Sequence, residues 1–196
     1  MGLLMLLITT SRRPSRRTRS FIRDLYHVIP GAKRVNRGKK SVEDLKKLAI
    51  GEGLKRVLIV GTLKGNPSTL TFLSTLPTEV QYLPLMIWLN GVTLRREMTK
   101  RRAPFVRSLG VARTPRVPDE FVLGFSSGLG TDDFKEIEEP EDVPKLVDYY
   151  DVILLIQKKG TEIVASFYCT HPAFELGPRM YLGGVKKIGG NSIDND

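Results

Sequence analysis

Blocks of apolar and polar residues predict strands and helices in alternation along the first half of the chain. The apolar run from Leu3 to Thr9 predicts a buried strand, because it lacks the polar alternation of a half-exposed one. A helix follows, with Ser15 or Thr18 at its start and its end near Val28, before Pro30. The chain therefore opens with a strand–helix unit.

The alternation continues through the rest of this half. A short strand, a helix capped by Ser41 and three more strands are expected at Ala32 to Asn36, Ser41 to Gly51, Arg56 to Val60, Thr69 to Thr75 and Val80 to Leu89. Such a series implies right-handed crossovers and a parallel or mixed sheet.

The first helix is amphipathic. At about 100° per residue, apolar side chains between Phe21 and Ile29 gather on one side. Arg16, Arg19 and Arg23 line up on the opposite side. One face is expected to pack against the sheet while the other presents guanidinium groups to solvent.

The second half is less regular. Residues 98–119 are rich in arginine and proline, which indicates a linker with one short helix near Phe105 to Leu109. The run Phe121 to Ser127 then repeats the pattern of Leu6 to Ser11, an apolar strand that ends in hydroxyl residues. An acidic helix is then expected at Val143 to Tyr150, followed by strands at Val152 to Ile156 and Glu162 to Cys169. The tail past Gly189 is expected to be loose.

These elements predict an α/β fold of two similar halves, with mixed sheets flanked by helices. We assign residues 1–97 to a basic N-terminal half, 98–119 to a basic linker and 120–190 to a partly acidic C-terminal half.

Charge is distributed unevenly over these parts. The formal net charge is +10. Residues 1–60 hold fifteen Lys or Arg against four Asp or Glu, a net +11, whereas residues 120–151 hold two against ten, a net −8. A basic surface of this kind favours nucleic acid as the partner over an anionic membrane surface. A fragment ending near Val117 is therefore expected to bind RNA about as well as the full chain, provided that it folds.

The cellular compartment follows from the cysteine count and the apolar runs. Cys169 is the single cysteine, so no intrachain disulfide is expected and a reducing compartment, the cytoplasm, is indicated. The opening residues run straight into arginines and resemble a strand more than a signal peptide. The apolar runs are too short to span a bilayer.

Side chains suited to phosphate gather in two basic clusters. Arginine forks bind phosphate oxygens bidentately, and hydroxyl groups at a strand end can donate to the same backbone. The helix that begins at Ser41 adds free amides beside Lys39 and Lys40. The predicted RNA-binding residues are Thr9, Thr10, Ser11, Arg12, Arg13, Arg16, Arg17, Arg19, Arg23, Lys33, Arg34, Asn36, Arg37, Lys39, Lys40, Lys64 and Arg179.

Three of these residues have a second interpretation. Asn36 either orients a base or caps the turn, Lys64 either touches RNA or is an exposed turn lysine, and Arg179 either binds or packs beside Pro178. The aromatic residues offer little for base stacking, because Phe21, Phe72 and Trp88 fall at apolar positions typical of a core.

Five short motifs, taken together, resemble those of the Brix-domain family, nearest to its member in the small-subunit processome. They are Ile8-Thr9-Thr10-Ser11-Arg12, Arg34-Val35-Asn36-Arg37-Gly38, Leu63-Lys64-Gly65-Asn66-Pro67, Gly124-Phe125-Ser126-Ser127 and Gly177-Pro178-Arg179. Their order and spacing cover nearly the whole chain, and the compact length resembles an archaeal version.

The resemblance implies a ribosome biogenesis protein that binds ribosomal RNA or a guide RNA and acts in pre-rRNA processing and subunit assembly. It also implies two halves that each look like the anticodon-binding domain of class IIa aminoacyl-tRNA synthetases. Asp132, Asp133 and Glu136 stand where the family usually carries basic residues. The second half is therefore a candidate docking surface for a basic ribosomal or assembly protein.

Catalysis has weaker support in the sequence. Cys169 and His171 are two apart, as a nucleophile and base could be, but no third orienting residue is evident. Gly61-Thr62-Leu63-Lys64-Gly65 lacks the ending of a P-loop, and Gly128-Leu129-Gly130 lacks the third glycine of a dinucleotide fingerprint. The pairs Asp132–Asp133 and Glu138–Glu139 could hold Mg²⁺ for RNA processing. We expect no cofactor and no catalysis, with a metal-dependent RNA-processing enzyme or a protein-interaction module as the alternatives.

Overall fold

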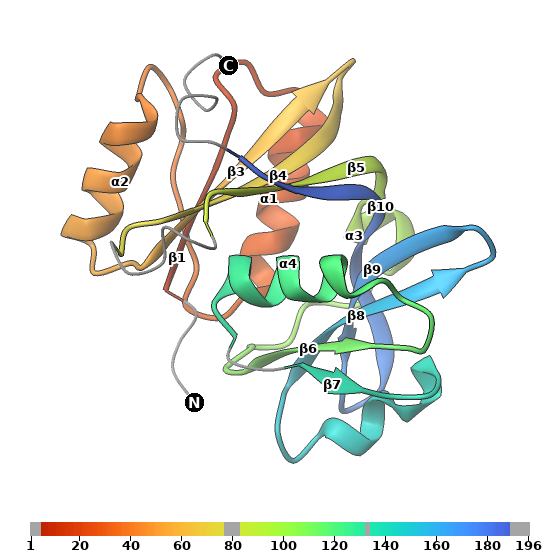
Figure 1. Cartoon of the computed structure of the whole chain (residues 1–196). Helices are drawn as coiled ribbons and strands as arrows, with labels where there is room; N and C mark the ends of the chain where they lie inside the picture. The colour runs from red at the N-terminus through yellow and green to blue at the C-terminus, as the bar shows by residue number, and fades with distance from the viewer. Residues whose placement is uncertain (1–4, 77–82, 132–133, 189–196) are drawn as a thin grey trace.

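The sheet of this protein combines strands from both ends of the chain. The computed structural model describes residues 5–76, 83–131 and 134–188 (Figure 1). Within these residues, ten strands form a single mixed sheet in the order β2-β1-β3-β4-β5-β10-β9-β8-β6-β7. The two sheets expected from the sequence are thus one sheet, because β5 pairs with β10 along their lengths, from Thr93 with Arg179 to Leu85 with Lys187.

The first half follows the predicted order of elements closely. Its elements are β1 Leu6–Thr10, α1 Arg16–Val28, β2 Lys33–Arg34, α2 Val42–Gly51, β3 Arg56–Leu63, β4 Asn66–Ser74, β5 Leu85–Thr93 and the short α3 Arg95–Met98. Strand β1 runs parallel to β2 and β3, and β3, β4 and β5 run antiparallel. Parts of two predicted strands, residues 3–4 and 80–82, lie outside the described residues.

The second half repeats this pairing pattern in a different part of the chain than predicted. Its elements are β6 Leu109–Arg113, α4 Asp119–Leu129, β7 Lys135–Glu136, the 3₁₀ helix η2 Pro140–Leu146, β8 Val152–Lys159, β9 Glu162–Cys169 and β10 Phe174–Lys187. Strand β6 runs parallel to β7 and β8, and β8, β9 and β10 run antiparallel. The topology is therefore symmetric about the β5–β10 pair.

The predicted strand Phe121 to Ser127 is wrong, because these residues lie in helix α4. Pro118 stands at the N-cap, acidic residues follow in the first turn, and Gly130 ends the helix in the left-handed region at φ 78°. The buried positions Phe121, Val122, Phe125 and Leu129 have helical spacing.

The strand equivalent to β1 is β6. The match extends to single hydrogen bonds: Ser11 N donates to Val60 O at 2.9 Å, and Thr114 N donates to Ile156 O at 3.0 Å. The loop equivalent to the basic loop before α1 is thus residues 114–118, which precede α4.

Three smaller predictions also need correction. The expected linker contains β6, and its residues 102–108 form no helix. The acidic helix is a 3₁₀ helix that begins earlier, at Pro140, and has Pro144 inside it, which removes a backbone donor. The sequence did not predict strand β10, because glycines and Pro178 interrupt its apolar pattern. Its pairing with β5 has bulges near Leu182. The tail past Gly189 lies outside the described residues.

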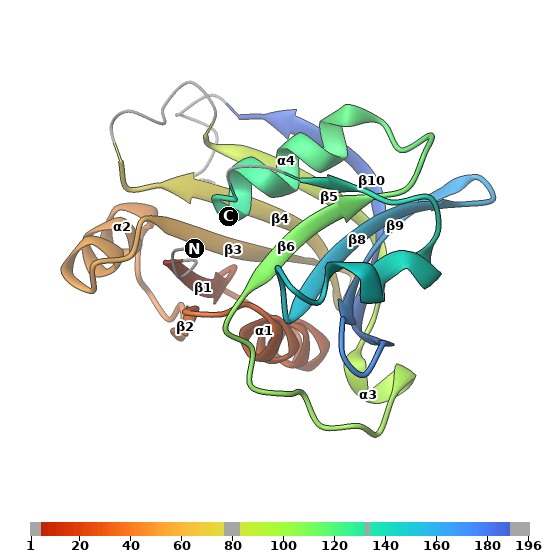
Figure 2. The ribbon, with the colours of Figure 1, turned by 90° about the horizontal axis from the view of Figure 1, so that it is seen from below.

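Helices α1 and α4 contribute to one continuous apolar core. Phe21 and Leu25 of α1 share this core with Phe121 and Phe125 of α4. Viewed from below, the two helices flank β6 (Figure 2). The opposite face of the sheet carries two smaller clusters, one beneath α2 and one beneath η2. The two halves therefore depend on each other for burial.

Trp88 does not belong to this core. Phe21 and Phe72 are buried as predicted, but Trp88 is 40% exposed. Successive residues of a strand point to opposite faces, so Ile87 and Leu89 enter the core and Trp88 points away from it. The assignment of Trp88 to the core is wrong.

A substitution in α4 should reveal how tightly it packs on the first half. A Cβ atom at Gly128 would lie 2.7 Å from the ring of Phe72, which is 1% exposed and has no room to move. We expect Gly128→Ala to reduce the free energy of unfolding by about 1–3 kcal/mol through overpacking. Urea unfolding measures this loss. The matched control is Gly51→Ala, where the added Cβ atom has no neighbour within 4 Å and the free energy of unfolding should not fall. Equal stabilities of the two variants would contradict tight packing at Gly128.

Candidate nucleic-acid interface

Helix α1 presents a stripe of guanidinium groups to solvent. Its start is fixed by Ser15, whose hydroxyl accepts a hydrogen bond from Thr18 N at 3.0 Å. Arg16, Arg19 and Arg23 are exposed on the side opposite the buried residues, as the sequence predicts. We call these three residues the α1 stripe. Arg12 and Arg13, also exposed, lead into it from the preceding loop.

Arg17 lies on a different side of the helix and has an internal role. Its guanidinium pairs with Glu97 of α3, with Nη1–Oε1 at 2.5 Å and Nη2–Oε2 at 2.8 Å, and donates to Val92 O at 2.9 Å. The hydrogen bond from Arg17 lowers the pKa of Glu97. Arg17 is therefore left out of the interface proposed below, because these contacts already join α1 to α3.

The threonines at the end of β1 are also unavailable. Thr9 is fully buried and donates from Oγ1 to Val35 O at 2.9 Å, while Thr10 is 3% exposed. Both residues are therefore left out of the interface proposed below, because burial keeps their hydroxyl groups from the surface. Ser11 is half-buried and remains near the surface.

The β2–α2 loop forms a second basic region with a less open geometry. Arg34, Asn36 and Lys39 are exposed. Lys33 pairs with Glu52, and Lys40 donates to Asn36 O at 3.3 Å. Arg37 is 5% exposed and is therefore removed from the predicted contact set.

The start of α2 is already occupied by a carboxylate. Ser41 and Asp44 form a reciprocal capping box, with Asp44 N donating to Ser41 Oγ at 3.1 Å and Ser41 N donating to Asp44 Oδ2 at 2.8 Å. The backbone hydrogen bond from Ser41 lowers the pKa of Asp44. The predicted anion site at this helix start is corrected, since Asp44 supplies the negative charge itself.

Lys64 and Arg179 differ in their availability. Lys64 is exposed at the tip of the β3–β4 hairpin, where φ is 48° at Lys64 and 81° at Gly65, as a two-residue primed turn requires. Arg179 pairs bidentately with Glu175, at 2.8 and 2.6 Å, and the hydrogen bond to Glu175 raises its pKa. The pair with Glu175 favours the structural alternative for Arg179 over RNA binding.

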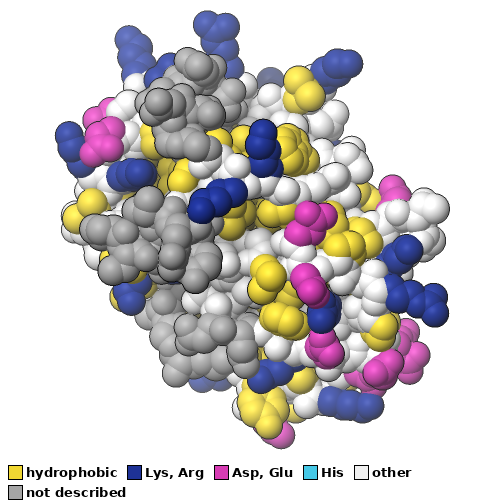
Figure 3. Space-filling model, viewed as in Figure 1, with side chains coloured by type: hydrophobic (Ala, Val, Ile, Leu, Met, Phe, Trp, Pro, Cys, Tyr) yellow, Lys and Arg dark blue, Asp and Glu magenta, His cyan; other side chains and the backbone are white. Residues whose placement is uncertain are grey.

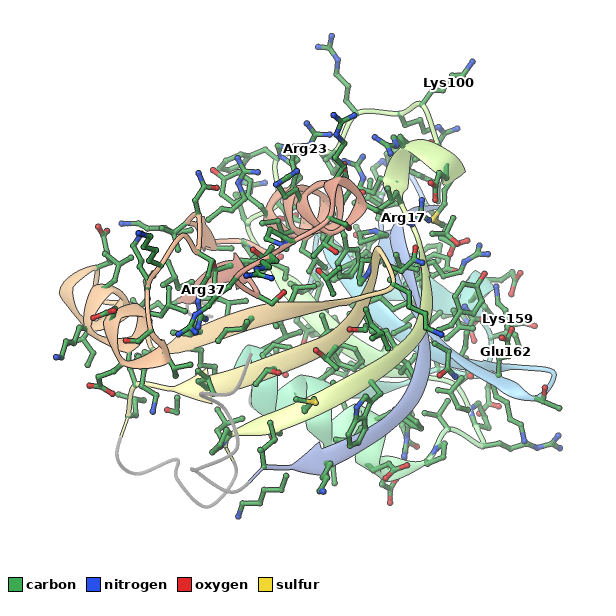
Figure 4. All side chains as sticks on the ribbon, turned by 90° about the horizontal axis from the view of Figure 1, so that it is seen from above. Arg17, Arg23, Arg37, Lys100, Lys159 and Glu162 are labelled. Atoms are coloured by element: carbon green, nitrogen blue, oxygen red, sulfur yellow. The ribbon has the colours of Figure 1, made fainter. Side chains whose placement is uncertain are left out.

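A basic segment that the sequence assigned to a linker lies beside the α1 stripe. Lys100, Arg101, Arg102 and Arg107 are exposed, and Arg23 and Lys100 lie on the same side of the molecule (Figure 4). Helix α3 anchors this segment, because Arg95 N donates to Asp24 Oδ2 of α1 at 3.0 Å and Arg95 Nη2 donates to Arg101 O at 3.2 Å. The charge was visible in the sequence, but its position next to α1 was not.

Comparison with known proteins identifies the family. No protein-family model matches the chain. A probable Brix domain-containing ribosomal biogenesis protein of Pyrococcus abyssi is 37% identical over 176 residues, which are 84% of this chain and 75% of that protein. The chain belongs to the Brix-domain family. The resemblance of the five motifs is thereby confirmed.

Two further comparisons place this Brix-domain protein within ribosome biogenesis proteins. The crystal structure of a probable ribosomal biogenesis protein from Aeropyrum pernix K1 matches with a TM-score of 0.67 and 30% identity, covering 91% of this chain and 94% of that one. The U3 small nucleolar ribonucleoprotein protein IMP4 of Bos taurus is 34% identical over 128 residues, 63% of this chain but 38% of that protein. The mixed sheet with flanking helices is thus shared with a solved relative.

In the described second half of this Brix-domain protein, helix α4 carries no stripe equivalent to that of α1. Helix α4 begins with Asp119 and Glu120 and contains no Lys or Arg. Arg113, at the end of β6, pairs with Asp119 and Glu136. Acidic side chains gather over this half at the lower right of Figure 3, and those exposed include Glu120, Glu136, Glu138, Glu139, Glu141 and Asp148. The charge difference between the halves is therefore a feature of the surface.

The candidate catalytic groups that the structure describes show no metal-binding cluster and no activated thiol. Cys169 is buried, its Sγ lies 3.4 Å from the backbone O of His171, and burial raises the pKa of its thiol. Among the described residues, no three His, Cys, Asp or Glu side chains are grouped to hold a metal. Asp132 and Asp133 lie outside the described residues. No helix in the described part of the chain is long and apolar enough to cross a membrane.

Proposed function

We propose that this Brix-domain protein binds ribosomal RNA or a guide RNA and acts in pre-rRNA processing and subunit assembly without catalysis. The observation that carries the proposal is the α1 stripe, three exposed arginines on one helix face, continued by Arg12 and Arg13. Guanidinium groups free of acidic partners suit phosphate oxygens. A surface of this kind in a family of ribosome biogenesis proteins favours RNA as the ligand.

The interface proposed here is smaller than the set predicted from sequence. It keeps the exposed members and leaves out Thr9, Thr10, Arg17, Arg37 and Arg179, whose side chains are buried or paired within the protein. It adds the neighbouring basic segment Lys100 to Arg107. Lys33 and Lys40 stay at its margin, because each already has a partner in the β2–α2 region.

The proposal assigns a different role to each half of the chain. Residues 1–97 would supply the RNA-binding surface, residues 98–119 would extend it, and residues 120–190 would dock a basic ribosomal or assembly protein through exposed carboxylates. The symmetric strand order supports two related halves. Likeness of each half to the anticodon-binding domain of class IIa aminoacyl-tRNA synthetases, and action in the cytoplasm, belong to the same proposal.

Incubation of the full chain with structured ribosomal RNA, with and without Mg²⁺, tests this function. We expect binding whose affinity falls steeply as salt rises, because each phosphate contact releases counterions, and RNA that stays intact in both conditions. Fluorescence anisotropy measures binding and a denaturing gel shows the RNA. Cleavage that depends on Mg²⁺ would favour the metal-dependent enzyme, and lack of binding at low salt would contradict the proposal.

A further inference from the structure

A groove beside the basic loop contains the one tryptophan of the chain. It has a volume of about 880 Å³ and lies over the outer faces of β3, β4, β5 and β10. These strands cross the front of Figure 4, with α4 behind them. Arg12 and Arg13 line the groove together with Trp88 of β5. The loop that leads into the α1 stripe thus also borders this groove.

The indole is held in place yet remains open to a ligand. Trp88 pairs with Thr69 of β4 on one side and with Gly184 of β10 on the other. Gly184 has no side chain to cover the ring, and a Cβ atom there would lie 3.6 Å from Trp88 Cε3. At 40% exposure, the ring is partly packed and partly available for stacking.

The remaining lining mixes apolar side chains, such as Leu63 and Met86, with polar ones, and none of the described lining carries negative charge. Ser11, Ser68 and Thr69 bring hydroxyl groups, and Asn90 brings an amide whose Nδ2 lies 3.4 Å from Leu182 O. None of the described residues that line the groove is acidic. Two arginines and an indole line the same groove, so a ligand that carries both negative charge and a flat ring fits this lining.

We propose that the groove binds a single-stranded segment of RNA, with one base stacked on Trp88 and neighbouring phosphates held by Arg12 and Arg13. Stacking on an aromatic side chain requires an unpaired base, so duplex RNA is excluded from this site. The amide of Asn90 and the hydroxyl groups are placed to bond the base edge or the ribose. This inference rests on the proposed RNA-binding function and specifies a second, single-strand site next to the α1 stripe.

The fluorescence of Trp88 reports whether a ligand occupies the groove, because the chain contains one tryptophan. Titration of the full chain with short single-stranded oligoribonucleotides should quench the tryptophan fluorescence to saturation, and a duplex of the same sequence should not. Polyglutamate is the probe for an acidic peptide. Quenching by polyglutamate equal to that by RNA, or by duplex equal to that by single strand, would overturn the proposal.

Substitution of the indole separates this site from the α1 stripe. We expect Trp88→Ala to weaken binding of single-stranded RNA about tenfold, as loss of one stacked base does, and Trp88→Phe to retain most of the affinity. Tyr149→Ala, at a residue 61% exposed on the second half, is the matched control and should change nothing. Circular dichroism confirms that each variant folds.

The outcomes distinguish the two proposals. If the wild-type chain binds no RNA, the general function fails. If the wild-type chain binds single-stranded RNA and Trp88→Ala binds it equally well, the groove proposal fails and the function stands. Arg12→Ala and Arg13→Ala should in addition lower the salt dependence of single-strand binding, by a slope of about 0.7 for each lost phosphate contact.

Discussion

Reversal of charge at Arg19 and Arg23 is expected to weaken binding of structured ribosomal RNA at least tenfold at moderate salt. Both side chains are exposed on the α1 stripe, one turn apart. Each lost phosphate contact removes counterion release and lowers the slope of log affinity against log salt by about 0.9 for a duplex. Glutamate at the same positions adds repulsion, so the affinity falls further than for alanine.

The measurement is a salt series of anisotropy titrations with Arg19→Glu/Arg23→Glu. The matched control is Lys158→Glu/Lys159→Glu, which makes the same change in net charge at exposed positions of the β8–β9 hairpin, remote from Arg23 (Figure 4). If both double variants lose affinity equally, the net charge of the protein and not the α1 stripe governs binding. An unchanged salt slope for the α1 variant would show that Arg19 and Arg23 contact no phosphate.

The α1 stripe could be predicted because it depends on local sequence alone. Helical periodicity places Arg19 and Arg23 opposite Phe21 and Leu25 whatever the rest of the chain does. Arg17 could not be judged in this way. Its partner Glu97 is eighty residues further along the chain, and only the tertiary arrangement brings α3 against α1.

The errors in the second half have a common physical cause. Short apolar runs such as Phe121 to Ser127 suit either a strand or a buried helix, and periodicity does not decide between them. The helix start at Pro118 and the acidic first turn were the discriminating signals. Strand β6 was hidden because it is five residues long and is flanked by arginines and prolines.

Trp88 shows what strand periodicity leaves undetermined. Met86, Ile87, Trp88 and Leu89 are all apolar, so the sequence suggests burial on both faces of β5. Whether a face is buried depends on what covers it, and in the described structure α4 covers only the face that Ile87 occupies. The groove could therefore be found only after the layers were known.

A fragment of residues 1–117 is expected not to fold, which revises the expectation that it would bind RNA like the full chain. Its β5 would lose the pairing with β10 and become an exposed edge. It would also lose α4, which packs Gly128 on Phe72 and accepts a hydrogen bond from Arg56 Nε at Ser127 O, 3.2 Å away.

The size of this loss supports the expectation. Phe121, Val122, Phe125 and Leu129 of α4 are each at most 5% exposed. Burial of one such side chain contributes about 1.5–3 kcal/mol, and the net stability of a whole domain is about 5–15 kcal/mol. Removing all four, together with the strand that closes the sheet, leaves the first half without enough burial to offset its chain entropy.

Circular dichroism and a two-dimensional amide NMR spectrum of the fragment measure the outcome, with the full chain under identical conditions as the control. We expect a spectrum with little dispersion and no cooperative thermal transition. A dispersed spectrum with a cooperative transition would show that the first half is an independent domain. In the expected case, RNA bound by the fragment reflects an unfolded basic chain, so the RNA-binding surface must be tested by point substitutions in the intact protein, where the shared core holds α1 and its arginines in place.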